Sequence, residues 1–175
     1  MGAERTFWRS LAVFAAASAL LFAAYARLGP DLLRPYVIDA ATVAPAARLI
    51  QWLDPGSGVR AAGAALAWPG ARLSVLNGCD GVDALILLLA AFAAAPLGLR
   101  ARLSGMALGA ALVWSLNQLR LVALYWAFRT RSDWFEALHV VIGPLVLIGA
   151  AGLFFVAWTS RGRIGRPPAL DGAPA

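Results

Sequence analysis

Four long apolar runs divide the chain into segments of membrane-crossing length. They are Leu11–Leu28, Gly81–Leu99, Ser104–Phe128 and Trp134–Trp158. A helix needs about 20 mostly apolar residues to cross a bilayer, and these runs are close to that length. Tryptophans stand near their ends, as in an interfacial aromatic belt: Trp8, Trp126, Trp134 and Trp158. The pattern predicts an all-α integral membrane protein with about four transmembrane helices.

The segment that joins the first two runs has two patterns of its own. Apolar positions in Tyr36–Leu53 suit a short amphipathic helix that lies on the membrane surface. Val59–Ala67 and Arg72–Leu76 then flank a Trp-Pro-Gly-Ala sequence, and Pro followed by Gly fits the centre of a type II turn. We therefore expect a short β-hairpin that delivers the chain to Cys79.

The two ends of the chain differ from the middle. The first run has a basic start, and Ala24-Tyr25-Ala26 resembles a signal-peptide cleavage site. Because further membrane-length runs follow, we interpret it as a retained helix. After Trp158 the chain is basic and then rich in Pro, Gly and Ala. The sequence thus predicts one membrane-embedded domain over 1–158 and a disordered cytoplasmic tail over 159–175.

Composition supports the membrane interpretation. The chain is 61% hydrophobic and only 14% charged, whereas soluble domains carry about 25% charged residues. The basic residues are all arginine and give a net charge of +6. These arginines are scattered between the apolar runs, which argues against nucleic-acid binding and is typical of the basic flanks of membrane helices.

The arginines also suggest an orientation. With both termini in the cytoplasm, equal numbers of arginines fall on the two sides, but the cytoplasmic ones lie in shorter segments and closer to helix ends. That is where the positive-inside rule applies. We therefore expect a multi-pass protein with both termini in the cytoplasm and the connection after the third run facing the exterior. Arg129, just beyond that run, is expected to lie in water.

Three unusual side chains share one membrane face in this arrangement: Cys79, Arg120 and His139. Cys79 precedes the second run, and the other two lie roughly 7–10 Å inside the third and fourth runs, at 1.5 Å per residue. An arginine inside a membrane helix costs about 2.5–3.5 kcal/mol on insertion scales, so it is rarely idle. A single Cys and a single His cannot form the usual zinc site or an internal disulfide, so we expect no metal or cofactor.

These residue types suit nucleophilic catalysis. Cysteine attacks carbonyls as a thiolate, and the start of the helix after Cys79 is expected to lower its pKa. His139 can take the thiol proton and return it to a leaving amine. Backbone N–H groups around Gly81, together with Arg120, can stabilise an oxyanion.

Neighbouring polar residues have less specific interpretations. Asp80 and Asp83 are better suited to capping a helix than to acid catalysis. Asn117 shares a helix face with Arg120 and either orients it or bonds a neighbouring helix. Trp114, in the middle of the third run, is expected to serve packing.

Three short motifs resemble a known family. Asn77-Gly78-Cys79-Asp80-Gly81-Val82 resembles the Cys-Ser-Gly-type active-site motif of exosortases and archaeosortases, and Asn117-Gln118-Leu119-Arg120 resembles their Asn-x-x-Arg motif. His139 with Gly143 resembles their final His-containing helix. Order and spacing agree over 55–158, and the short chain resembles the small exosortase H type. An aspartate replaces the small residue that usually follows the family's cysteine.

The resemblance implies a membrane cysteine protease-transpeptidase with a Cys/Arg/His site at the outer face. Such an enzyme cleaves the C-terminal sorting signal of an exported protein, which consists of a short motif, a membrane helix and a basic tail. It then passes the new C-terminus to an acceptor. Two other interpretations stay open: a non-enzymatic membrane assembly subunit, in which Arg120 pairs with a partner's carboxylate, and, less well supported, a small transporter.

Overall fold

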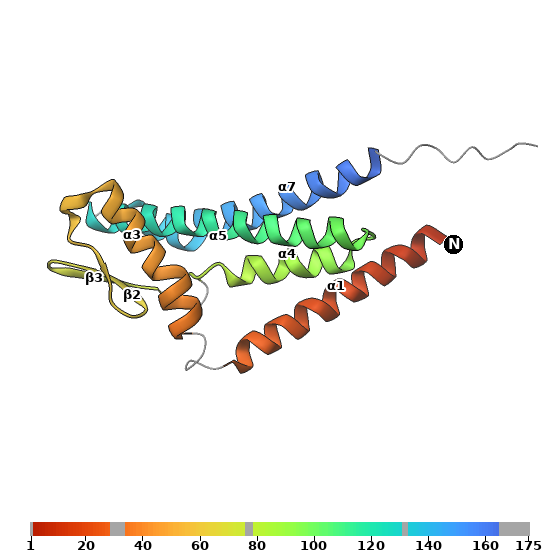
Figure 1. The fold of residues 1–175 in the computed structure, drawn as a ribbon, viewed down its shortest axis with the longest axis horizontal. Helices are drawn as coiled ribbons and strands as arrows, with labels where there is room; N and C mark the ends of the chain where they lie inside the picture. The colour runs from red at the N-terminus through yellow and green to blue at the C-terminus, as the bar shows by residue number, and fades with distance from the viewer. Residues whose placement is uncertain (1, 29–33, 76–78, 131–132, 165–175) are drawn as a thin grey trace, which may run out of the picture.

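A computed structural model describes residues 2–28, 34–75, 79–130 and 133–164. Long helices lie side by side in a bundle, and a shorter helix and a small sheet gather at one end of it (Figure 1). The start of α1 and the last turn of α7 lie at the opposite end (Figure 1). Both helix ends therefore lie at the same end of the bundle, as the predicted orientation requires.

Three of the helices are long and apolar enough to cross a bilayer. The first is α1 (Gly2–Arg27), and the second is α5 (Leu99–Arg129). The third is a continuous helix that comprises α6 (Trp134–Glu136), the π-helical segment η3 (Ala137–Ile142) and α7 (Gly143–Ile164). These elements support the predicted helical membrane fold, and α7 continues beyond Trp158, while 165–175 lie outside the described residues.

The remaining apolar helix, α4, is shorter than the sequence predicted. The second run was expected to span Gly81–Leu99, but α4 (Val82–Ala94) has only 13 residues, or about 20 Å at 1.5 Å per residue. Pro96 causes the early end, because it forces the preceding Ala95 into an extended conformation (ψ 141°). The structure therefore supports three spans by length and composition, and not four.

The connection between α4 and α5 also differs from the expected basic loop. Residues 98–102 were expected to form that loop, but α5 already begins at Leu99. The Arg102 guanidinium donates hydrogen bonds to the carbonyl oxygens of Ala95 and Leu97, at 3.1 and 3.3 Å. These bonds tie the start of α5 to the connection that follows α4, so the turn is tighter than the charge pattern suggested.

The predicted amphipathic helix over Tyr36–Leu53 is present. It consists of the π-helical segment η1 (Arg34–Val43) followed by α3 (Ala44–Leu53). Its apolar face packs into the protein core through Ile38 and Ile50, where a helix lying on the membrane surface was expected, whereas Trp52 stays exposed. The helix runs across the end of the bundle rather than along it (Figure 1).

The predicted hairpin is also present, within a three-stranded antiparallel sheet. β2 (Ala65–Trp68) pairs with β3 (Ala71–Ser74), and β1 (Arg60–Ala61) adds a third strand on the other side of β2. Gly70 has a φ of 84°, the left-handed value that a type II turn needs after Pro69. The predicted strand Val59–Ala67 is instead two strands, β1 and β2, which are separated by residues 62–64 and pair with each other, so the sheet has one strand more than the predicted hairpin.

Two apolar cores hold these elements together, and α5 contributes to both. One core packs α3 and the sheet against the second half of α5 and includes Val43, Leu66 and Tyr125. The other packs α4 and α7 against the first half of α5. Gly109 allows this close approach, because a Cβ there would lie 2.6 Å from Leu88. Residues near the middle of α5 thus lie between the two cores.

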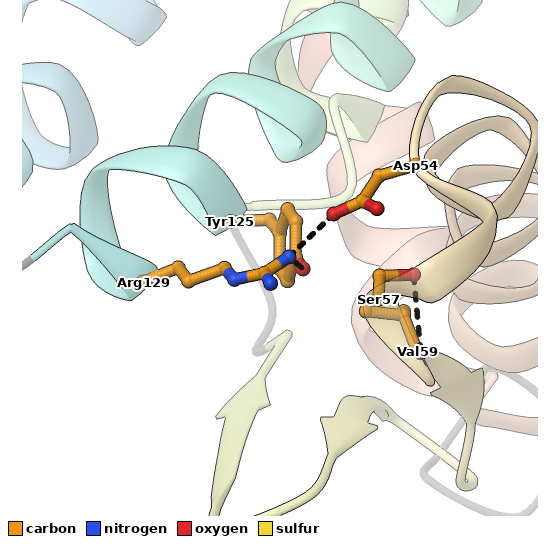
Figure 2. Close-up of polar contacts among 5 residues, drawn as sticks. All are labelled: Asp54, Ser57, Val59, Tyr125 and Arg129. Atoms are coloured by element: carbon orange, nitrogen blue, oxygen red, sulfur yellow. Dashed lines mark hydrogen bonds and ion pairs between the residues drawn. The ribbon is translucent and has the colours of Figure 1, made fainter.

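A polar clamp joins α3 to the end of α5 (Figure 2). Arg129 Nη1 donates to Asp54 Oδ2 at 2.5 Å and to the Tyr125 hydroxyl at 2.7 Å. Beside it, the Val59 amide donates to Ser57 Oγ at 3.3 Å. The Arg129 side chain is exposed, as expected, but Arg129 is the last residue of α5 instead of lying beyond it, and its side chain links two elements.

Candidate active site

Cys79 lies in the turn that leads into α4, beside α3 and the sheet. Its side chain is half-buried against the core formed by α3, the sheet and α5. Gly81 caps α4 with a φ of 80°, in the left-handed region that glycine favours. The turn therefore holds the sulfur at a fixed place just before the first turn of the helix.

His139 faces the sulfur from a different element. It lies on η3, and its ring stacks on Phe135 with centroids 5.8 Å apart and planes 11° apart. The Cys79 sulfur is 3.7 Å from Nδ1 and 3.9 Å from Nε2. Either ring nitrogen is thus near the thiol, within the looser range seen in nucleophile–base pairs without substrate.

Arg120 joins the two from α5. Its Nη2 donates to the His139 backbone carbonyl at 2.9 Å and to the Cys79 sulfur at 3.9 Å. The side chain is 9% exposed. Gly143 leaves it room, because a Cβ at that position would lie 2.5 Å from Arg120 Nε. The structure therefore brings together the three residues that the sequence singled out, from three separate elements.

The electrostatic environment of Cys79 differs from what the sequence suggested. Burial raises the pKa of the thiol above its ordinary value, and the nearby Asp80 raises it further, while Arg120 opposes both. The net direction is upward, opposite to the lowering expected from the start of a helix. This environment favours the neutral thiol over the thiolate, so a base such as His139 would be needed to deprotonate the sulfur for attack on a carbonyl.

Neither Asp80 nor Asp83 is the N-cap residue of α4, which is Gly81. Asp80 still binds the start of the helix, because its Oδ1 accepts a hydrogen bond from the Val82 amide at 3.1 Å, and its Oδ2 accepts one from the Tyr25 hydroxyl. Asp83 is the second residue of α4 and does not cap it. Because the Val82 N–H is engaged, it is not available to an oxyanion, and the expected donors around Gly81 are fewer than the sequence implied.

Asn117 has a different role from either of the two expected. It is 1% exposed and lies under the cysteine turn, where a Cβ on Gly81 would be 3.1 Å from Asn117 Cγ. Within the described residues, its side-chain oxygen and nitrogen have no hydrogen-bond partner. Asn117 thus packs against the turn instead of bonding Arg120 or a neighbouring helix.

Trp114 has a polar contact in addition to packing. Its indole N–H donates to the Ala41 carbonyl at 2.8 Å, and this bond ties the middle of α5 to η1. The side chain is 48% exposed in the isolated chain. Trp114 therefore also anchors η1 to α5, and about half of its side chain lies outside the core.

The sequence analysis did not identify two residues that contact the site. Phe135 stands four residues before His139 in the same helix, a spacing that could have revealed its stacking. Tyr25 is 55 residues away from Asp80 along the chain and gives no local signal. Among the described residues, no group of three or more His, Cys, Asp or Glu side chains could hold a metal ion.

Comparisons with protein-family models, with curated proteins and with solved structures found no match to this chain. Any functional assignment therefore depends on the geometry of the site and the chemistry of its residues.

Proposed function

We propose that this chain is a membrane cysteine protease-transpeptidase of the exosortase type, which cleaves C-terminal sorting signals and transfers the new C-terminus to an acceptor. The main support is the position of the Cys79 sulfur, 3.7 Å from His139 Nδ1 and 3.9 Å from Arg120 Nη2. A nucleophile, a base and a fixed cation in one place are what acyl transfer requires.

The first half of the reaction forms a thioester. His139 takes the thiol proton while the Cys79 sulfur attacks the carbonyl carbon of the scissile bond. Negative charge develops on the carbonyl oxygen, and the Arg120 guanidinium stabilises it through its planar set of donors. The C–N bond then breaks, His139 gives its proton to the departing amine, and the signal helix leaves.

The second half releases the product. An amine or another nucleophile of the acceptor attacks the thioester carbon, and His139 takes the proton that the nucleophile loses. The C–S bond breaks, and the proton returns to the Cys79 sulfur. The site is then in its original state, with no net change in charge or oxidation state.

A cavity beside Arg120 suits an apolar substrate. It has a volume of about 230 Å³ and lies between α5 and the η3–α7 helix, with Leu119, Ile142 and Val146 among its lining residues. Leu119 and Val146 are more than half exposed in the isolated chain. A membrane-embedded signal that approaches from the lipid would therefore meet apolar side chains that lead to the reactive groups.

The proposed topology places this site at the outer face of a bacterial inner membrane. Both termini are cytoplasmic. α4 also crosses the membrane despite its length of 13 residues, which makes four membrane segments in total. A short apolar helix can be accommodated by local thinning of the bilayer or by packing between longer neighbours. The substrate is an exported protein with a motif, a membrane helix and a basic tail, and the acceptor is not specified.

The proposal is tested by following a candidate substrate. An exported protein with such a C-terminal signal, encoded beside this gene, is expressed with the wild-type chain or with Cys79→Ser, and its mass is measured. Cys79→Ser should insert normally and leave the precursor uncut, because an alkoxide is far harder to form than a thiolate. Processing at the wild-type rate by Cys79→Ser would refute the cysteine mechanism and favour the assembly-subunit interpretation.

A further inference from the structure

A second set of contacts reaches the cysteine turn from α1. Tyr25 lies in the last turn of α1 and donates its phenol O–H to Asp80 Oδ2. Asp80 directly follows Cys79 and is only 8% exposed. A helix far away in the sequence is thus bonded to the residue next to the proposed nucleophile.

Both oxygens of the Asp80 carboxylate are engaged. Oδ2 accepts from Tyr25 on α1, and Oδ1 accepts from the Val82 amide at the start of α4. The turn that carries Cys79 is therefore held between two helices by one side chain. A hydrogen bond to a charged group contributes more than one between neutral groups, so this link is strong enough to position a turn.

The charge of Asp80 also acts on the sulfur. The titratable and charged groups that face Cys79 are Arg120 from α5, His139 from η3 and Asp80 from its own turn. Asp80 raises the pKa of the thiol, and Arg120 lowers it. Hydrogen-bond donors on a carboxylate weaken its repulsion of a neighbouring thiolate, so the Tyr25 hydroxyl limits the effect of Asp80.

We propose that Tyr25 is a positioning residue for Cys79, acting through Asp80, so that α1 is part of the support of the active site. This inference rests on the proposed function. Tyr25 touches neither the substrate nor the reacting atoms. It holds the Asp80 carboxylate in place, and with it the turn from which the sulfur faces His139.

A purely structural role makes a different prediction. If Tyr25 only attached α1 to α4, its loss would lower the amount of folded protein and leave the reactivity of Cys79 unchanged. The two roles can be separated because the chain has one cysteine. The rate of alkylation by iodoacetamide therefore reports on Cys79 alone.

The experiment measures this rate on the purified full-length chain, from about pH 6 to about pH 11, to cover the titration of a thiol. Tyr25→Phe should shift the midpoint upward and slow alkylation about threefold or more at a fixed pH near 8. Asp80→Asn should shift the midpoint downward. The double variant should match Asp80→Asn alone, because the phenol then has no carboxylate to act on.

The matched control is Tyr36→Phe, since Tyr36 is 68% exposed at the start of η1 and should behave like the wild type. Rates are compared only for protein that elutes as a single folded species, and Asp80→Asn tests the same link without altering α1. An unchanged profile in Tyr25→Phe, or additive shifts in the double variant, would overturn the inference.

Processing assays separate this inference from the proposed function. If Cys79→Ser is inactive while Tyr25→Phe has the wild-type alkylation profile and processing rate, only the positioning role of Tyr25 is refuted. If Tyr25→Phe shifts the profile but Cys79→Ser still processes substrate, the proposed function is refuted. Tyr25 would then still affect the pKa of the Cys79 thiol, but this effect would have no role in catalysis.

Discussion

Gly143 provides the space that the Arg120 side chain occupies. A Cβ on Gly143 would lie 2.5 Å from Arg120 Nε, 2.9 Å from its Cδ and 2.7 Å from the Leu138 carbonyl oxygen. Two of these atoms belong to the arginine and the third to the backbone of η3, so an added methyl group must displace one or the other. The position of the guanidinium therefore depends on a glycine of a neighbouring helix.

Gly143→Ala should reduce substrate processing by about tenfold or more, since small displacements of reacting groups are costly. The matched control is Gly149→Ala on the same helix, where an added Cβ would meet nothing within 4 Å. Processing rates and the amounts of both variants in the membrane check this. Equal rates for the two variants would show that Arg120 tolerates displacement.

Arg120→Lys tests whether the planar guanidinium matters or only its charge. Lysine keeps the charge, but its ammonium group lacks the planar set of donors with which Arg120 reaches the His139 carbonyl and the Cys79 sulfur. Loss of an oxyanion donor typically lowers rates about 10²–10³-fold, so processing should fall about a hundredfold while insertion is normal.

The control for Arg120→Lys is Arg100→Lys, because Arg100 is exposed near the start of α5, at the end of the bundle away from the site. Arg129→Lys would be a poor control, since Arg129 bonds Asp54 and Tyr125. Full activity of Arg120→Lys would mean that Arg120 is a structural counter-charge.

The reactivity of Cys79 should depend on pH in a defined direction. Burial raises the pKa of its thiol, so at any given pH near neutrality a smaller fraction is thiolate than in a free thiol. Near neutral pH, alkylation should therefore be slower than that of a free thiol, and it should increase as the pH rises. Arg120→Ala should move the profile to still higher pH, because Arg120 lowers the pKa of the thiol.

A midpoint below that of a free thiol, measured by iodoacetamide alkylation across this range, would contradict the electrostatic description of the site. It would also mean that the start of α4 outweighs burial, as the position of Cys79 in the sequence suggested.

The membrane orientation is tested by labelling from one side. An impermeant maleimide added outside intact cells at mildly alkaline pH should label Cys79, and a reporter fused after Arg163 should be cytoplasmic. Labelling that requires permeabilised membranes would place the site on the other face. Cys79→Ser is the blank for the label, since it removes the chain's one thiol.

Much of the fold follows from patterns that are local in the sequence. The long helices α1 and α5 and the helix from Trp134 to Ile164 overlap three apolar runs and extend beyond each of them by several residues at one end, because hydropathy locates the apolar part of a helix and not its boundaries. The turn at Pro69-Gly70 is likewise set by two adjacent residues. The length of α4 was overestimated because the apolar run continues past Pro96, whereas the helix ends before it.

The sequence by itself determined which side chains were candidates, since Cys79 and His139 are single and Arg120 lies within an apolar helix. Only the tertiary structure decided their geometry: the 3.7 Å approach of sulfur to Nδ1, the space left by Gly143 and the bond from Tyr25 to Asp80. These contacts join residues far apart in the chain, so no periodicity encodes them. The direction of the Cys79 pKa shift also depended on the fold, because burial is a property of packing and not of the local sequence.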